Sequence, residues 1–242
     1  MSIWGSLIGG MVGLSLGGPF GMLLGSIIGG KISRARSAGG NFASFAQPQQ
    51  IFALSLIVLS AKLSKADGQV SKEELVAVKD KLKIPEHEIE QVGKIFNKAK
   101  EESAGYEPYA QQIAQIYKNN PNVLEEVINI LFYIAEADGN VSKSELNMMW
   151  HIAQIFGLND LEFSAIKESR KSSDKLNPYV VLASKPDEDL SSIRKRYIQL
   201  SKENHPDLLI SKGVPPEVIE ESKKKMRAIN SAWDQIQKLK NN

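Results

Sequence analysis

The sequence predicts an all-α protein with a single transmembrane helix, a helical central domain and a small carboxy-terminal helical hairpin. After residue 50, apolar residues recur at helical spacing almost everywhere, and the alternating patterns typical of strands are scarce. The 242 residues leave room for a membrane element and two domains of modest size. The absence of cysteine excludes a disulfide scaffold, a thiolate metal site and a cysteine nucleophile.

The charge balance argues against a nucleic-acid partner. The chain has 30 Lys and Arg against 28 Asp and Glu, a formal net charge of +2. Residues 176 to 242 have 12 basic and 9 acidic side chains, a ratio typical of a solvated surface rather than of a phosphate-binding face. A nucleic-acid binder that uses a basic helix on phosphates is therefore the weaker alternative.

Residues 1 to 30 are predicted to form the transmembrane helix. Residues 3 to 28 contain no charged side chain, and an uncharged apolar run longer than about 18 residues is typical of a membrane span. Basic residues follow this run and none precedes it, which argues against a cleaved signal peptide. Lys31, Arg34 and Arg36 then predict a single-pass protein with residues 31 onward in the cytoplasm. Residues 31 to 49 read as a cytoplasmic linker.

Glycine recurs at every fourth position of the predicted span. On a helix, this spacing forms one groove without side chains, into which a second helix can pack closely. We therefore expect a homodimer through the membrane helix, although glycine could instead only make the segment flexible or break it. The glycines are Gly5, Gly9, Gly13, Gly17, Gly21, Gly25 and Gly29.

Residues 50 to 171 are predicted to form the central domain of about seven helices and contain an internal repeat. The helices are expected at 50–66, 71–83, 86–103, 107–118, 122–137, 142–156 and 159–171. The ten residues 66 to 75 are echoed by residues 137 to 146, each with the pattern Ala-Asp-Gly-x-Val-Ser-x-x-Glu-Leu.

The repeated pattern has two interpretations. It matches the second half of a calcium-binding EF-hand loop, but the oxygen ligands of the first half are missing. The preferred interpretation is a helix stop at the glycine followed by a capping box between Ser142 and Glu145, and likewise in the first copy. The repeats resemble the TerB-like helical domain, and this resemblance implies that the acids of the two loops could form a metal or partner site. The weak metal candidates are Asp67, Glu74, Asp138 and Glu145.

The carboxy-terminal domain, residues 172 to 242, is predicted to contain two antiparallel helices, 189–204 and 216–239. The first has an apolar stripe that includes Tyr197 and an opposite basic side. Pro206 lacks an amide hydrogen and keeps His205 out of the helical region, so the first helix should end there. The tripeptide His205-Pro206-Asp207 is then expected at the exposed end of the hairpin.

Three motifs together resemble a J-domain: Asn177-Pro178-Tyr179 with Leu182, the basic helix ending in His205-Pro206-Asp207, and Ile229-Asn230-x-Ala232-Trp233. The resemblance implies a DnaK-type chaperone as partner, whose ATP hydrolysis the domain stimulates. It implies no catalytic residue and no cofactor in this chain. The implied partner-binding residues are Arg194, Lys195, Tyr197, Lys202, His205, Pro206 and Asp207.

The sequence departs from the J-domain pattern at four positions. Ile198 and Gln199 replace residues that are commonly basic, Leu208 follows the aspartate where Lys or Arg is frequent, and Ala183 stands where Gly is frequent. The order of span, TerB-like domain and J-domain resembles that of bacterial membrane-anchored DnaJ-like co-chaperones. This resemblance implies the bacterial inner membrane, with a periplasmic amino terminus and cytoplasmic carboxy-terminal domains. A co-chaperone is therefore the predicted function, and a metal-responsive stress or envelope sensor acting through the central domain is the alternative.

Overall fold

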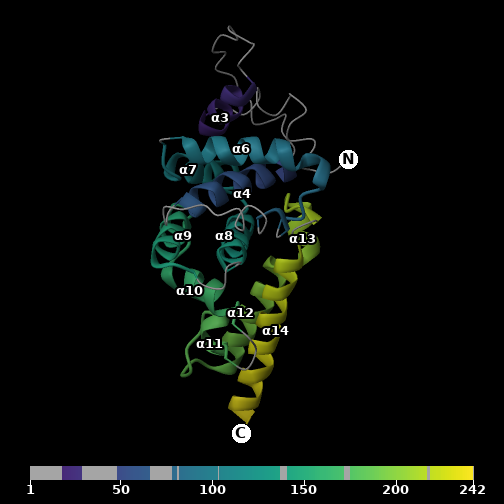
Figure 1. The fold of residues 1–242 in the computed structure, drawn as a ribbon. Coiled ribbons are helices and arrows are strands. Elements are labelled where there is room, and N and C mark those ends of the chain that lie inside the picture. The colour runs from purple at the N-terminus through teal and green to yellow at the C-terminus, as the bar shows by residue number, and fades with distance from the viewer. Residues whose placement is uncertain are drawn as a thin grey trace.

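The computed structural model describes residues 18–28, 48–65, 78–80, 82–102, 104–136, 141–171, 175–216 and 219–241. Every regular element within these ranges is a helix, as the sequence predicts. The helices form a central bundle, which is built from α4 to α10, and a carboxy-terminal hairpin, which is built from α11 to α14 (Figure 1).

Helix α4 (Pro48–Lys65) is the core of the central bundle. Fourteen of its 18 residues are buried, on all sides of the helix, which is typical of a helix enclosed by others. It contacts α6 (Ile89–Glu101), α7 (Glu107–Ile116), α8 (Pro121–Ala135) and α9 (Lys143–Ile155). The short helix η2 (Glu86–Glu88) precedes α6, and α10 (Asp160–Glu168) ends the bundle.

Local sequence signals set several helix starts in the bundle. Proline lies in the first turn of α7 and of α8, where its missing amide hydrogen is not needed. The capping box predicted for the second repeat is confirmed: the Ser142 hydroxyl accepts the Glu145 amide at 3.1 Å, and a Glu145 carboxylate oxygen accepts the Ser142 amide at 2.8 Å. Ser71 and Glu74 of the first repeat lie outside the described residues.

Helix α3 (Gly18–Ile28) is the described part of the predicted transmembrane helix. Phe20, Leu23 and Leu24 are buried where α3 packs on α6 and α7. The Phe20 ring meets the edge of Tyr109 at a centroid distance of 5.1 Å. Residues 1–17 and 29–30 of the predicted span lie outside the described ranges, and within those ranges none of the helices is long and apolar enough to cross a bilayer.

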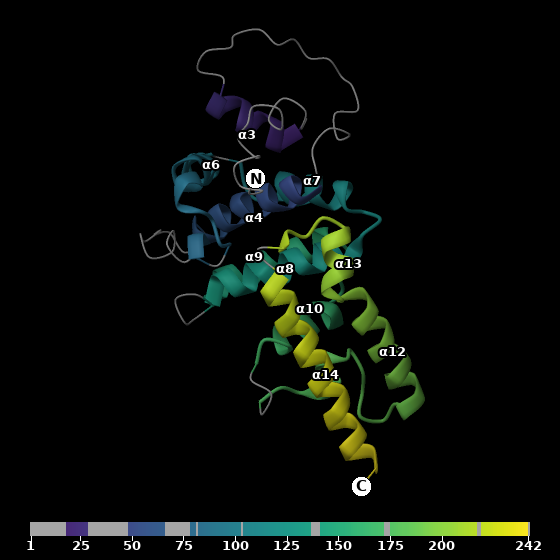
Figure 2. The same cartoon turned by 90° about the vertical axis from the view of Figure 1, so that its right-hand side faces the viewer.

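The carboxy-terminal hairpin has its own small apolar core. It contains α11 (Pro178–Val181), α12 (Leu190–Glu203), α13 (Pro206–Ser211) and α14 (Ile219–Asn241), with α12 and α14 side by side (Figure 2). The Tyr197 ring stacks on Trp233 at a centroid distance of 5.1 Å and an interplanar angle of 8°. The buried core residues are Leu176, Val181, Leu182, Ile193, Ile229, Ala232, Trp233 and Ile236.

The loop end of the hairpin packs on the central bundle. Leu209, Val214 and Ile219 are buried, and they belong to the apolar core of the bundle rather than to that of the hairpin. The backbone at Gly213, whose φ is +104°, lies very close to Pro48 at the start of α4. A Cβ atom on Gly213 would lie 2.5 Å from the Cβ atom of Pro48. The sequence predicted only a connection between the two long helices over residues 205–215, whereas the structure has α13 there and packs this segment on the bundle.

Polar contacts between α8 and the hairpin surround this apolar packing. The Asn122 side-chain amide donates to the Glu203 carbonyl at 3.0 Å, and its oxygen accepts from Lys212 Nζ at 3.1 Å. The Ser222 hydroxyl donates to Glu126 Oε1 at 2.6 Å, inside the interface. We call these contacts, together with Leu209, Val214 and Ile219, the docking interface.

Glu126 is a buried acid at the docking interface. Burial raises the pKa of its carboxyl group to about 7. The charge of Lys225 and the hydrogen bonds from Ser222 and Asn129 lower this pKa, but by less than burial raises it. Lys225 Nζ itself lies 2.5 Å from an oxygen of the neighbouring Glu125. Glu126 is therefore an acid that folding keeps protonated to a higher pH than the unfolded chain would.

The raised pKa of Glu126 predicts a pH dependence of stability. Below pH 4.5 the Glu126 carboxyl is protonated in both the folded and the unfolded state, and its full contribution to folding stability is present. Between pH 4.5 and about 7 only the unfolded chain ionises this carboxyl. Stability should fall across this window by on the order of 3 kcal/mol, since one pKa unit corresponds to about 1.4 kcal/mol. Glu126→Gln should remove this part of the pH dependence in urea unfolding at pH 4.5, 6 and 8. Parallel pH profiles for the two proteins would contradict the assignment.

Ala183 has a positive φ of 45°, in the left-handed region that disfavours a Cβ atom. The strain explains why glycine is frequent at this position in the domains that the sequence resembles. Ala183→Gly should therefore stabilise the hairpin by about 1 kcal/mol, since glycine adopts this conformation without steric cost. Thermal unfolding of the two proteins, followed by far-UV circular dichroism, measures the difference; a less stable glycine variant would contradict the prediction.

Candidate functional site

The tripeptide His205-Pro206-Asp207 lies at the junction of α12 and α13. His205 is extended, with φ −65° and ψ 129°, and is the N-cap of α13, where its Nδ1 atom accepts the Asp207 amide at 3.3 Å. Pro206 is the first residue of α13, where its fixed φ suits a helix start. The His205 and Asp207 side chains are 54% and 88% exposed, and the closest approach of imidazole and carboxylate is 3.8 Å. The loop thus presents both groups to solvent on a fixed backbone.

An exposed face of α12 leads up to the tripeptide. Arg194, Lys195, Ile198, Gln199 and Lys202 are all exposed, and their spacing places them along one side of the helix. Ile198 is the large apolar side chain of this face and is 39% exposed. The face therefore combines three cations with an apolar patch, next to an imidazole and a carboxylate.

Two further side chains of α12 point elsewhere. Arg196 forms an ion pair with Glu188 at 3.0 Å and so does not add its charge freely to the exposed face. Tyr197, predicted as a partner-binding residue, stacks on Trp233, and its hydroxyl donates to Asn230 Oδ1 at 3.3 Å. The structure thus places Tyr197 at the contact between α12 and α14, where it holds the helix that bears the cations.

The start of α12 is fixed by Asp189. Its carboxylate accepts the Ser192 amide at 2.9 Å, as an N-cap residue does. Hydrogen bonds from the Ser192 side chain and amide, with further bonds from Ser191, hold the pKa of Asp189 well below its usual range. An ionised carboxylate at this helix end also complements the macrodipole.

Sequence reading did not find the bundle residues that contact the loop. Asn122 binds the chain on both sides of the tripeptide, through Glu203 before it and Lys212 after it. The sequence does carry a signal for these contacts, because Asn122, Glu125, Glu126 and Asn129 form a polar stripe at helical spacing in the otherwise largely apolar α8. Buried polar residues in such a helix require partners, and here these come in part from the hairpin.

The weak metal candidates do not form a site in the described residues. Asp67, Glu74 and Asp138 lie outside the described ranges, and the Glu145 carboxylate takes part in the capping box. Within the described residues, no group of His, Asp or Glu side chains is placed to hold a metal ion. Of the glycines in the predicted groove, Gly21 and Gly25 lie on α3, and the others are outside the described ranges: Gly5, Gly9, Gly13, Gly17 and Gly29.

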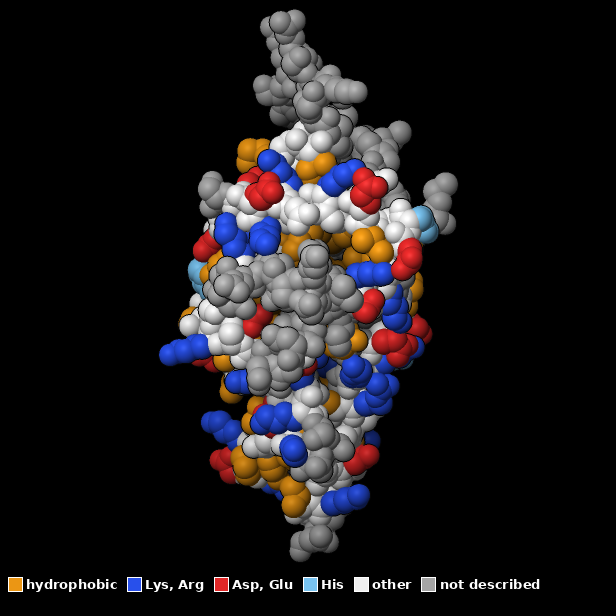
Figure 3. All heavy atoms as spheres, in the orientation of Figure 1, with side chains coloured by type: hydrophobic (Ala, Val, Ile, Leu, Met, Phe, Trp, Pro, Cys, Tyr) orange, Lys and Arg blue, Asp and Glu red, His pale blue; other side chains and the backbone are white. Residues whose placement is uncertain are grey.

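The surface charge of the hairpin is mixed rather than uniformly basic. Figure 3 shows blue Lys and Arg side chains spread over this part of the molecule, with red Asp and Glu side chains among them. Such a distribution differs from the continuous basic stripe that typically binds a nucleic-acid backbone. It suits a protein partner whose charges complement particular positions.

Comparison with known proteins gives two family matches. The family of tellurite resistance protein TerB matches residues 53–168, which corresponds to the central bundle. The transmembrane domain of the co-chaperone DjlA matches residues 1–39. No solved structure gives a significant match.

Relatives of similar length extend the match over nearly the whole chain. Co-chaperone protein DjlA of Escherichia coli (strain K12) is 24% identical over 268 residues, covering 99% of each chain. DjlA of Photobacterium profundum is 25% identical over 274 residues, covering 98% of this chain and 99% of the relative. DjlA of Vibrio parahaemolyticus is 27% identical over 245 residues, covering 87% and 86%. With matches to the DjlA transmembrane domain and to the TerB family, the chain is similar over nearly its whole length to DjlA co-chaperones.

Proposed function

We propose that this protein is a membrane-tethered J-domain co-chaperone that stimulates ATP hydrolysis by a DnaK-type chaperone. The observation that carries the proposal is the exposure of His205 and Asp207 directly beside the exposed cations of α12. Similarity over nearly the whole chain to proteins named as co-chaperones supports the same function. The J-domain corresponds to residues 172–242 in this proposal.

Each residue of the site has a distinct role in the proposed complex. Arg194, Lys195 and Lys202 guide encounter and orientation with an acidic surface of the chaperone. Asp207 engages a basic residue of the partner's nucleotide-binding domain, and His205 completes the contact. ATP and the hydrolytic groups belong to the partner, so this chain catalyses no reaction itself.

The fixed backbone of the loop lowers the entropic cost of the proposed contact. Pro206 and the cap formed by His205 fix the backbone before the partner arrives, so little conformational entropy remains to be lost on binding. Ile198 adds apolar area in the middle of the basic face, where a cation is common in J-domains. We therefore expect a weaker salt dependence of chaperone binding than for a J-domain with cations at positions 198 and 199.

The proposal includes a membrane anchor at the amino terminus and an orientation of the chain across the membrane. The family match to a transmembrane domain at residues 1–39 supports anchoring of the chain in a membrane. Lys31, Arg34 and Arg36, after the apolar run, support an orientation with the TerB domain and the J-domain in the cytoplasm of a bacterial cell. The site would then meet soluble chaperone close to the inner membrane.

Dimerisation through the membrane helix is a separate part of the proposal. Close packing of two spans requires the glycine groove, because lipid supplies no hydrophobic driving force between helices. Gly13→Leu with Gly17→Leu should abolish association in a membrane two-hybrid assay, whereas Leu7→Ile, which keeps both glycines, should not. Association that persists in the double glycine variant would show that the glycine groove does not cause it.

The chaperone contact is tested by single-turnover ATP hydrolysis. The full chain in detergent micelles should accelerate hydrolysis by a DnaK-type chaperone. His205→Gln and Asp207→Asn should each reduce this acceleration by about tenfold or more, the scale expected when one charged partner of a buried contact is truncated. Glutamine at 205 can still accept the Asp207 amide, so the cap and the fold should survive.

A matched control separates the site from general charge effects. Asp234→Asn removes the same charge from an exposed position of α14 and should leave the acceleration unchanged. Circular dichroism should give the same helix content for all variants. Acceleration that survives both His205→Gln and Asp207→Asn would falsify the proposed site.

A further inference from the structure

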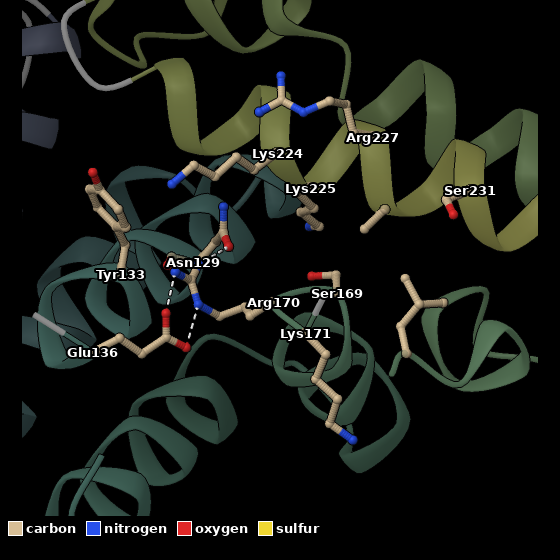
Figure 4. Close-up of a pocket in the computed structure, with 12 residues that line it drawn as sticks. Asn129, Tyr133, Glu136, Ser169, Arg170, Lys171, Lys224, Lys225, Arg227 and Ser231 are labelled. Atoms are coloured by element: carbon tan, nitrogen blue, oxygen red, sulfur yellow. Dashed lines mark hydrogen bonds and ion pairs between the residues drawn. The ribbon is translucent and has the colours of Figure 1, made fainter. Parts of the chain in front are cut away.

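A pocket of about 560 Å³ lies where the central bundle meets the hairpin. Its walls come from α8, from the end of α10 and the residues after it, and from α14 (Figure 4). The pocket is separate from the tripeptide and from the exposed face of α12, since none of their residues lines it. The proposed chaperone contact therefore leaves it unexplained.

The lining of the pocket has more basic than acidic side chains. It contains five Lys or Arg residues and the carboxylate of Glu136. Two carboxylates that do not line the pocket also pair with its cations: Glu168 lies 2.7 Å from Lys171 Nζ, and Glu125 lies 2.5 Å from Lys225 Nζ. The carboxylate of Glu136 is bound by Arg170, whose Nε and Nη2 atoms donate to its two oxygens at 2.8 and 2.6 Å. The basic residues are Arg170 and Lys171 from the bundle, and Lys224, Lys225 and Arg227 from α14.

The cations are held in place rather than dispersed in solvent. Arg170 is only 10% exposed, and its Nη1 atom also donates to the backbone and side-chain oxygens of Asn129. Lys224 Nζ lies 4.6 Å from the centroid of the Tyr133 ring, and the guanidinium carbon of Arg170 lies 5.8 Å from it. The Tyr133 ring thus contacts one cation from the bundle and one from the hairpin, and these cation–π contacts order both side chains.

An excess of positive charge remains after these pairs are counted, because five cations face three carboxylates. Low-dielectric walls weaken screening and concentrate the positive potential inside the pocket. An anion placed among these side chains would be attracted by this excess charge and would accept charge-assisted hydrogen bonds from both sides. Since the cations come from two parts of the chain, such an anion would also link the bundle to the hairpin.

We propose that this pocket binds a small phosphate-bearing ligand, with the phosphate between the bundle and α14. A phosphate has three terminal oxygens and accepts hydrogen bonds from several directions, which suits separate donors on different walls. The Ser231 hydroxyl accepts from Gln235 Nε2 at 3.3 Å, which leaves its own hydrogen to be donated. The volume exceeds that of a phosphate group alone, and Leu176 and Ala228 supply apolar lining for an organic portion of the ligand.

The test measures binding of inorganic pyrophosphate to the full chain in neutral detergent micelles by isothermal titration calorimetry. We expect saturable binding to one site per chain at fixed ionic strength. Lys224→Glu with Arg227→Glu should weaken this binding by more than about tenfold, since two charge-assisted contacts are lost. Both residues are exposed at the pocket rim, and Lys224→Gln with Arg227→Gln is the milder variant if charge reversal impairs folding.

A control of equal charge change tests for nonspecific attraction. Lys223→Glu with Lys238→Glu alters two exposed lysines of the same helix that do not line the pocket, and it should change the affinity by less than about twofold. Equal weakening in the two double variants, or the absence of saturable binding to the unaltered chain, would overturn the proposal. Malonate, a dicarboxylate, should bind more weakly than pyrophosphate, and equal binding would overturn the assignment to phosphate. The readout involves no chaperone, so its outcome is independent of the proposed co-chaperone function.

Discussion

The architecture depends on the packing of the hairpin's loop end against α8 and the start of α4. Leu209, Val214 and Ile219 complete the apolar core of the bundle, so the tripeptide next to them is held by a domain that precedes it in the chain. Asn122 strengthens this arrangement, because it binds the backbone before the tripeptide and a side chain after it. The candidate site is therefore a loop stabilised by contacts from two domains.

Docking determines which groups of the hairpin remain available. It buries one side of α13 and the first turns of α14, while His205, Asp207 and the cations of α12 stay exposed. The central bundle then supports the loop of the proposed chaperone contact, and the pocket lies along the same boundary. A change in how the two parts pack would alter the loop and the pocket together.

The features that the sequence predicted are those set by neighbouring residues. Pro206 ends α12 through its own ring, and Ser142 and Glu145 cap a helix across three positions, so both could be anticipated. The helices of the bundle follow from apolar periodicity in the same way. The docking interface could not be anticipated, because Asn122 and Lys212 are 90 residues apart and periodicity does not say which apolar faces meet. Helix α13 has only six residues, too few for a periodic pattern.

The stacking of Tyr197 on Trp233 has a spectroscopic consequence. The chain has three tryptophans: Trp4 lies in the predicted membrane segment, Trp150 in the bundle and Trp233 in the hairpin. Trp150 is 40% exposed, with its indole nitrogen donating to Asp160, whereas Trp233 is 8% exposed against an aromatic ring. Their emission should therefore differ in wavelength and in quenching, so that fluorescence can follow the bundle and the hairpin separately without an attached dye.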